Sequence, residues 1–206
     1  MKQKTVGIVL FEGFELLDVF GPAEAYRSPQ LKDAFQLVMI AEARGVVTSA
    51  QGPQIVPNQS FADAPTFDLL MVPGGIGTRR EVDNPVLMTW LRARVAETEF
   101  VTSICTGAGL LARAGLLDGH RATSNKFAFD WVKSQGPRVN WVAQARWVED
   151  GKFWTSAGVS AGIDMALAII ARICGTAAAE RTAARMEYEW HRDPGWDPFA
   201  EMWGRA

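Results

Sequence analysis

The sequence of 206 residues contains only two histidines and two cysteines. They are Cys105, Cys174, His120 and His191, and they are widely scattered along the chain. A zinc site normally needs three or four such ligands at close and regular spacing. We therefore expect no metal site. A Cys-His-Asp triad is also difficult to assemble, because neither histidine adjoins a cysteine.

An excess of basic residues and a long hydrophobic run are also missing. Lys and Arg number 21 against 23 for Asp and Glu, which gives a net charge of −2. Nucleic-acid-binding domains are usually basic, and a membrane helix needs about 20 consecutive apolar residues. No signal-peptide pattern precedes the first apolar run. We expect a cytoplasmic protein without a structural disulfide and with neither a nucleic acid nor a membrane as its partner.

Short apolar segments rich in β-branched residues alternate with helical ones over the whole chain, which predicts a single domain spanning 1–206. This alternation is typical of an α/β fold, with a mainly parallel sheet sandwiched by helices. The predicted strands are 5–11, 35–41, 67–72, 100–104 and 121–124, with a small β excursion at 46–56 and a hairpin formed by 140–148 and 152–156. The predicted helices are 14–27 (bent or interrupted at Gly21-Pro22), 84–98, 106–114, 127–134, 160–173 and 176–190, before a tail rich in Pro and Trp.

The segment around Cys105 is typical of a nucleophile elbow. A predicted strand ends there and a predicted helix follows, with the small residues Ser103 and Gly107 two positions to either side. Such a turn holds the nucleophile in a strained backbone conformation at the carboxyl edge of the sheet. The N-terminus of the helix is expected to lower the pKa of the thiol. The alternative is a cysteine buried in the core, which is common.

Asp18 stands between the apolar residues Leu17 and Val19, where a carboxylate is costly unless it has a partner or a function. The first strand of such a sheet is often central, so the segment after it can reach Cys105. A protonated Asp18 would then hydrogen-bond the thiolate and act as a general acid. Glu15 lies one helical turn earlier, nearer to solvent. The alternative is that Asp18 caps a helix or forms a salt bridge.

A glycine-rich loop, Pro73-Gly74-Gly75-Ile76-Gly77, follows the predicted strand 67–72. We predict that Gly74, Gly75 and Ile76 bind the substrate, because glycines let backbone N–H groups approach a ligand or a developing anion. A dinucleotide fingerprint is disfavoured, since Arg80 stands where its third glycine is needed. The alternative is a plain turn that ends the strand.

The other cysteine and the histidines are interpreted as structural. Cys174 lies in an apolar helical segment, where core packing is its expected role. His120 lies in a turn and is expected to be exposed to solvent. His191, close to the C-terminus, either packs structurally, which we favour, or lines a pocket.

Several motifs together resemble the ThiJ/PfpI superfamily, which has the class I glutamine amidotransferase-like, flavodoxin-like fold. The motifs are Phe14-x-x-x-Asp18-x-x-Gly21-Pro22, Val72-Pro73-Gly74-Gly75, Ile104-Cys105-Thr106-Gly107-Ala108, the segment 114–123 (AGLLDGHRAT) and the segment 155–164 (TSAGVSAGID). Two positions depart from relatives with other functions. Thr106 stands where peptidase-like members carry histidine, and the segment 123–126 differs from the Thr-Thr-His-Trp of AraC-type regulators.

The resemblance implies roles for individual residues. Cys105 corresponds to the nucleophile of the family, Asp18 to the acidic residue that contacts it, and Thr106 to a residue that shapes the site. Gly75 and the backbone after Cys105 correspond to anion-binding amides. The family also implies a homodimer that acts on a small molecule without a cofactor.

The resemblance is greatest to the branch of the superfamily that hydrates isonitriles (R–N≡C) to N-substituted formamides. We therefore expect Cys105 to form a thioimidate, with Asp18 as general acid and base. One alternative is a glyoxalase- or deglycase-like enzyme acting on 2-oxoaldehydes. Another is a domain without enzymatic activity that senses a ligand or oxidation at Cys105.

Overall fold

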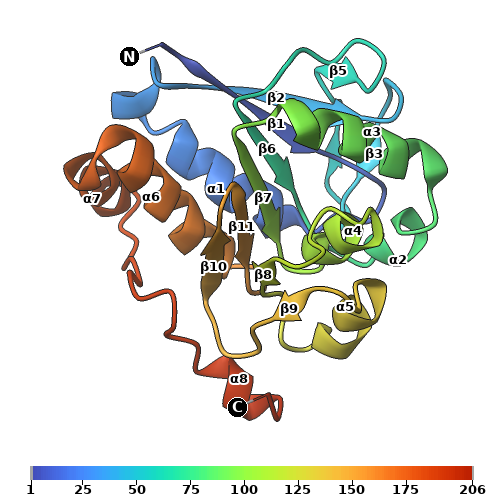
Figure 1. Ribbon diagram of the computed structural model, residues 1–206. Helices are drawn as coiled ribbons and strands as arrows, with labels where there is room; N and C mark the ends of the chain where they lie inside the picture. Colours follow the sequence, from blue (N-terminus) through green and yellow to red (C-terminus); the bar gives the residue numbers. More distant parts are fainter. Residues whose placement is uncertain (1, 206) are drawn as a thin grey trace.

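The computed structural model describes residues 2–205 and confirms the predicted α/β fold (Figure 1). Within these residues a seven-stranded sheet has the order β10-β11-β7-β6-β1-β2-β5. Every neighbouring pair is parallel except the antiparallel hairpin β10–β11. The strands are β1 (Lys4–Val9), β2 (Phe35–Ala41), β5 (Gln59–Ser60), β6 (Leu69–Val72), β7 (Phe100–Ile104), β10 (Trp147–Asp150) and β11 (Phe153–Ser156).

The central strands β1, β6 and β7 are largely buried because both faces of the sheet are covered. All four residues of β6 are buried. In β7 the small polar residues Thr102 and Ser103 are buried as well, and the Thr102 hydroxyl donates to the backbone oxygen of Leu70 (3.2 Å). Because these three strands run parallel, their carboxyl ends lie at the same edge of the sheet.

Helices cover both faces of the sheet (Figure 1). One layer contains α1 (Leu16–Tyr26), α6 (Ala161–Cys174) and α7 (Thr176–Arg185), which pack side by side. The other layer contains α3 (Pro85–Glu97) and α4 (Gly107–Arg113), with α5 (Phe129–Gln135) against α4. The short helices are η1 (Pro29–Leu31), α2 (Thr78–Glu81) and α8 (Phe199–Met202). Among the described residues, no helix combines the length and the apolar character that crossing a bilayer requires.

Helix α1 continues through Gly21-Pro22, where we expected a bend or an interruption. A proline inside a helix removes one backbone hydrogen bond, which tertiary packing can offset. Gly21 and Pro22 are both buried. A Cβ added to Gly21 would lie 2.8 Å from Ile163 of α6, so the two helices are in close contact at this point. This packing holds the helix in one piece.

Other elements differ from the prediction mainly in their ends. The first arm of the hairpin is shorter than predicted, because β9 (Asn140–Trp141) pairs instead with β8 (Arg121–Ala122) in a separate sheet. The excursion at 46–56 forms the antiparallel pair β3 (Val47–Thr48) and β4 (Gln54–Ile55). The last long helix ends at Arg185 rather than at residue 190, two residues before Glu187 at a φ of 49°.

Candidate active site

Cys105 occupies the sharp turn between β7 and α4 that the sequence predicted. Its φ is 56°, in the left-handed region that residues other than glycine and asparagine seldom adopt. Its N–H donates to the backbone oxygen of Ala157 (3.2 Å), and its carbonyl accepts from the hydroxyl of Ser124 (2.7 Å). Contacts from two other segments therefore hold the strained residue in place.

The turn leaves no room for larger neighbours. A Cβ at Gly107 would lie 2.2 Å from the backbone oxygen of Val72, and one at Gly74 would lie 2.5 Å from the nitrogen of Thr106. Real Cβ atoms do not approach other atoms this closely. The small residues of the elbow and of the glycine-rich loop are thus required by the close approach of their two backbones.

Two backbone amides face the sulfur of Cys105. They belong to Thr106 and Val159, and their hydrogen bonding lowers the pKa of the thiol. Val159 has a φ of 48°, which is rare for a β-branched residue. The thiol has a narrow opening to solvent, with Cys105 7% exposed. The backbone is therefore strained on both sides of the sulfur.

Asp18 is buried in α1 with one carboxylate oxygen committed and one free. Its Oδ2 accepts from the N–H of Gly74 (2.8 Å). Its Oδ1 is buried and has no hydrogen-bond partner among residues 2–205. Burial raises the pKa of Asp18 well above its ordinary value, and the charge of Glu15 raises it further. The protein therefore favours the protonated form of Asp18 more than water does.

The Cys105 thiol and Asp18 are electrostatically coupled. Burial raises the pKa of Cys105 most strongly, and the Asp18 charge raises it next. The Thr106 amide at the start of the helix lowers this pKa as expected, but desolvation outweighs it and the net shift is upward. The pair favours one negative charge over two, so it titrates as a unit. When Asp18 holds the proton, its repulsion disappears and the two amides stabilise the thiolate.

The glycine-rich loop and Thr106 are bonded to each other. The Thr106 hydroxyl accepts from the N–H of Gly75 (3.0 Å) and lies 3.1 Å from the hydroxyl of Thr78. Since the N–H of Gly74 is bonded to Asp18, the amides of both glycines are engaged within the protein. This differs from the prediction that they face a substrate, and here they fix the carboxyl and the threonine instead.

A cavity of about 230 Å³ opens onto Cys105. Of the predicted site residues it contains Cys105, Thr106, Gly75 and Ile76, while Asp18 and Gly74 lie beneath the surface. Ile76 is 67% exposed at its rim. The remaining lining residues are Glu15, Arg79, Asn125, Phe127, Ala128 and Val159.

Arg79 is a site residue that the sequence analysis missed. Its guanidinium lies 3.9 Å from the ring centre of Trp131 and donates to the Thr78 hydroxyl (3.1 Å). Burial lowers the pKa of Arg79 and the charge of Cys105 raises it, which places this cation near the sulfur. No motif marks Arg79, because only the packing of α2 against α4 and α5 directs it into the cavity.

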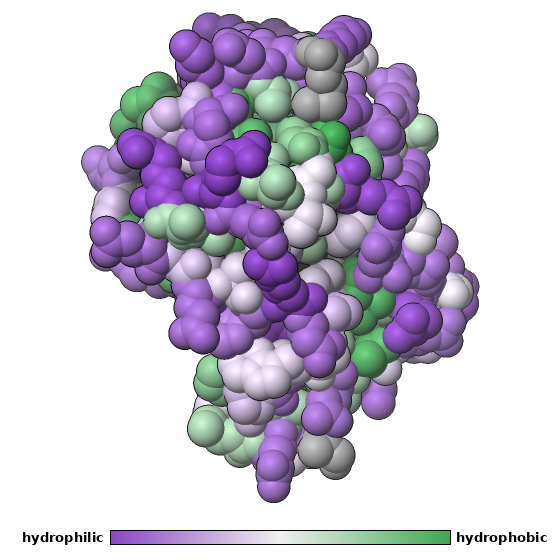
Figure 2. Space-filling view, turned by 90° about the vertical axis from the view of Figure 1, so that its left-hand side faces the viewer, coloured by the Kyte–Doolittle hydropathy of each residue, from purple (hydrophilic) through white to green (hydrophobic). Residues whose placement is uncertain are grey.

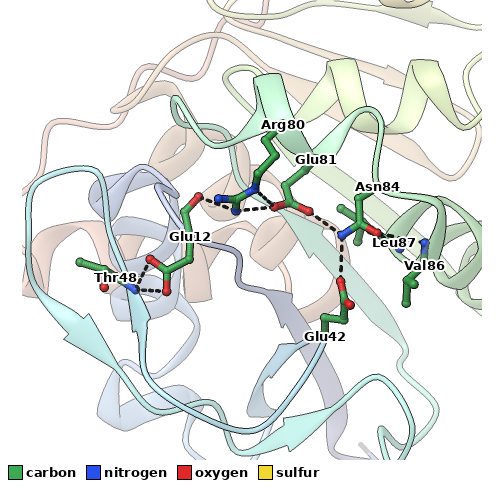
Figure 3. A network of polar contacts seen from close by, with 8 residues as sticks. All are labelled: Glu12, Glu42, Thr48, Arg80, Glu81, Asn84, Val86 and Leu87. Atoms are coloured by element: carbon green, nitrogen blue, oxygen red, sulfur yellow. Dashed lines mark hydrogen bonds and ion pairs between the residues drawn. The ribbon is translucent and has the colours of Figure 1, made fainter.

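A separate polar network anchors α2 (Figure 3). Buried Glu81 accepts from Arg80 Nε (2.9 Å) and from Asn84 Nδ2 (2.8 Å). Arg80 also donates to the backbone oxygen of Glu12 (3.4 Å). The network therefore ties the segments after β1 and β6 together and fixes the helix that carries Arg79. Its other members are Glu42, Thr48, Val86 and Leu87.

The histidines and the second cysteine lie outside the Cys105 cavity. The ring of His191 stacks on Trp196 with 4.1 Å between ring centres, and His120 Nδ1 lies 3.4 Å from Asp150. The stacking agrees with the structural interpretation of His191, whereas His120 is half-buried beside Phe153 and so less exposed than expected. Cys174 is half-buried at the end of α6, and so is less enclosed than the core position we expected.

Comparison with known proteins identifies relatives of the chain. A model of the DJ-1/PfpI family matches residues 4–172. Isonitrile hydratase of Pseudomonas putida is 33% identical over 183 residues, which cover 89% of this chain and 78% of that protein. The transcriptional regulator GbdR of Pseudomonas aeruginosa is 28% identical over 90% of this chain, which spans only 51% of the regulator. A crystal structure of a ThiJ/PfpI family protein from Pseudomonas syringae superimposes with a TM-score of 0.84 at 29% identity, covering 96% of this chain and 79% of that one.

Proposed function

The chain belongs to the DJ-1/PfpI family, and we propose that it is an isonitrile hydratase that uses Cys105 and Asp18. The observation that carries this proposal is the pair itself. A strained thiol lines a small cavity that no histidine lines, and a carboxyl with one unpartnered buried oxygen lies beneath that cavity, close enough for its charge to act on the thiol. The similarity to isonitrile hydratase over most of the chain supports the same activity.

The first step joins the sulfur to the terminal carbon of R–N≡C. The Cys105 thiolate donates its electron pair to that carbon while Asp18 delivers its proton there, which gives the thioimidate R–N=CH–S. The amides of Thr106 and Val159 hold the thiolate before attack. Arg79 stabilises the negative charge near the sulfur.

The second step consumes water. Asp18, now a carboxylate, takes a proton from a water molecule whose oxygen adds to the thioimidate carbon, and it passes this proton to the nitrogen, which gives the adduct R–NH–CH(OH)–S. In the collapse of the adduct Asp18 takes the hydroxyl proton as the C–S bond breaks, which releases the formamide R–NH–CHO and restores the Cys105 thiolate and the protonated Asp18. No amine leaves during these two steps. The reaction therefore does not need a histidine as the general acid that protonates a leaving amine, as a peptidase does.

A direct test compares two substrates. The purified protein is incubated separately with cyclohexyl isonitrile and with methylglyoxal, and the formation of N-cyclohexylformamide and of lactate is measured. We expect the formamide as the main product. Lactate formation without formamide would replace the proposal by the glyoxalase-like alternative. Glu15 at the rim of the cavity would be the additional base that this alternative needs.

A further inference from the structure

The C-terminal segment, residues 186–205, lies beyond the part of the chain matched by the family model and runs from α7 down one side of the molecule to α8 at its lower end (red in Figure 1). In the space-filling view it contributes to the narrower lobe at the lower end, where hydrophobic residues are exposed (Figure 2). Three ion pairs attach it, one of them between Arg192 and Glu180 of α7 (2.9 Å). Buried Lys126 contacts Asp197 at 3.0 Å, and Arg205 makes two contacts with Asp130 at 2.8 and 2.7 Å.

This segment forms one wall of a second cavity of about 200 Å³. The wall residues from the segment are Asp197, Phe199 and Trp203. The second cavity shares Asn125, Phe127 and Val159 with the Cys105 cavity, so the two adjoin. A molecule bound at the sulfur can therefore extend under the C-terminal segment. The other residues that line the second cavity are Lys126, Arg146, Ala157, Gly158 and Ser160.

Three aromatic side chains of the second cavity are exposed to solvent, and one of them, Phe127, also lines the Cys105 cavity. Phe127 is 70% exposed, Trp203 46% and Phe199 43%. The rings of Phe127 and Trp203 meet edge to face, with 5.0 Å between their centres. Exposed apolar side chains on a segment that ion pairs fix in place are typical of a binding site.

The charges of this cavity are already neutralised. Lys126 is paired with Asp197, and Arg146 is paired with Asp164 at 2.7 Å. All four side chains are almost completely buried. A charged ligand would find no free counter-charge here, whereas an apolar group would cover the exposed aromatic rings.

From this arrangement we propose that the C-terminal segment builds the subsite for the substituent R, and that R is a bulky apolar group, aromatic or cycloalkyl. The inference rests on the proposed isonitrile hydration. An isonitrile is linear, so R points directly away from the carbon that the sulfur attacks. R therefore leaves the small cavity at Cys105 and lies against Phe127 and Trp203.

The test compares substrates of different bulk. We expect Trp203→Ala to lower kcat/KM for benzyl isonitrile about tenfold and to leave the value for methyl isonitrile within about twofold. Trp203→Phe should retain most of the activity on benzyl isonitrile. Met202→Ala is the matched control, since Met202 directly precedes Trp203 at the end of α8 and lines neither cavity. An equal loss on both substrates, or no loss on either, would overturn the proposal.

A second readout separates this subsite from the proposed reaction. Cys105 is alkylated with iodoacetamide and with its N-benzyl derivative, and the modification is measured on the Cys105 peptide by mass spectrometry. Trp203→Ala should slow the benzyl reagent several-fold relative to iodoacetamide. A wild-type protein that hydrates neither isonitrile refutes the proposed function, and the alkylation ratio then decides the subsite by itself. An unchanged ratio overturns the subsite whether or not isonitriles are hydrated.

Discussion

The backbone N–H of Val159 faces the sulfur of Cys105, and both residues have a positive φ, 48° and 56°. Each of these conformations is unfavourable for its residue type. They are tolerated because the backbones on both sides are held by bonds to other segments, among them that of Cys105 N–H to Ala157 (3.2 Å). The strained conformations of Cys105 and Val159 thus belong to the arrangement that points the N–H of Val159 at the thiol.

The strain at Val159 predicts an inverted order of stability between two substitutions. At an ordinary position alanine is more stable than glycine, but glycine adopts a positive φ without steric cost. We expect Val159→Gly to have a higher free energy of unfolding than Val159→Ala, by about 1 kcal/mol. Both variants remove the same half-buried side chain, so each controls for the other. Urea unfolding measures the difference, and a more stable alanine variant would contradict it.

The turn at Cys105 predicts that two glycines of α4 respond differently to replacement by alanine. Gly107 should not tolerate it, whereas Gly109 should. The Cβ of Gly107→Ala would meet the backbone oxygen of Val72 at 2.2 Å, and backbone cannot move aside cheaply. We expect a loss of about 2 kcal/mol or more in the free energy of unfolding. In Gly109→Ala the new Cβ would lie 3.2 Å from a side-chain atom of Trp131, which can shift. Comparable denaturation midpoints for the two variants would show that the turn is not closed in this way.

Asp18 predicts a pH dependence of stability. Its pKa in the folded protein is raised by burial, so the folded state binds this proton more tightly than the unfolded state. The stabilisation is complete below the ordinary carboxyl pKa and is lost as the pH rises through the raised folded value. Asp18→Asn cannot lose a proton, so its stability relative to wild type should increase from pH 5 to pH 8. Chemical denaturation at both pH values measures this, and a constant difference would contradict the raised pKa.

Arg79 predicts a shift in the reactivity of the thiol. Its cation lies near Cys105 and favours the thiolate. In Arg79→Ala the pH profile of Cys105 alkylation should move to higher pH, and kcat/KM should fall about tenfold. Arg113→Ala is a suitable control, because Arg113 is exposed and paired with Asp83 (3.0 Å). A profile that stays in place would exclude Arg79 from the site.

The sequence predicts most of the fold because buried strands have a local signature. The apolar runs that became β2 and β7 begin and end at the predicted residues, 35–41 and 100–104. The two-residue strand β5 escapes prediction, and β9 lies in a predicted strand but pairs with β8 instead of in the hairpin, because such pairing depends on distant segments. The same is true of the end of α7 at Arg185, where the chain turns toward the C-terminal segment.

The candidate site also has a part that the sequence predicts and a part that it does not. The small residues around Cys105 are visible in the sequence, because a tight turn imposes them locally. Arg79 and Val159 carry no such mark, since their relation to the sulfur arises from packing between α2, α4 and the segment before α6. The engagement of the Gly74 amide by Asp18 (2.8 Å) was equally hidden.

The measurement that tests the central claim most directly is formamide formation from cyclohexyl isonitrile by four variants at one pH. We predict that Cys105→Ala abolishes turnover and that Asp18→Asn lowers kcat at least a hundredfold, while Cys174→Ala and Met202→Ala keep the wild-type rate. Full activity in Cys105→Ala or in Asp18→Asn would contradict the transfer of a proton between this sulfur and this carboxyl.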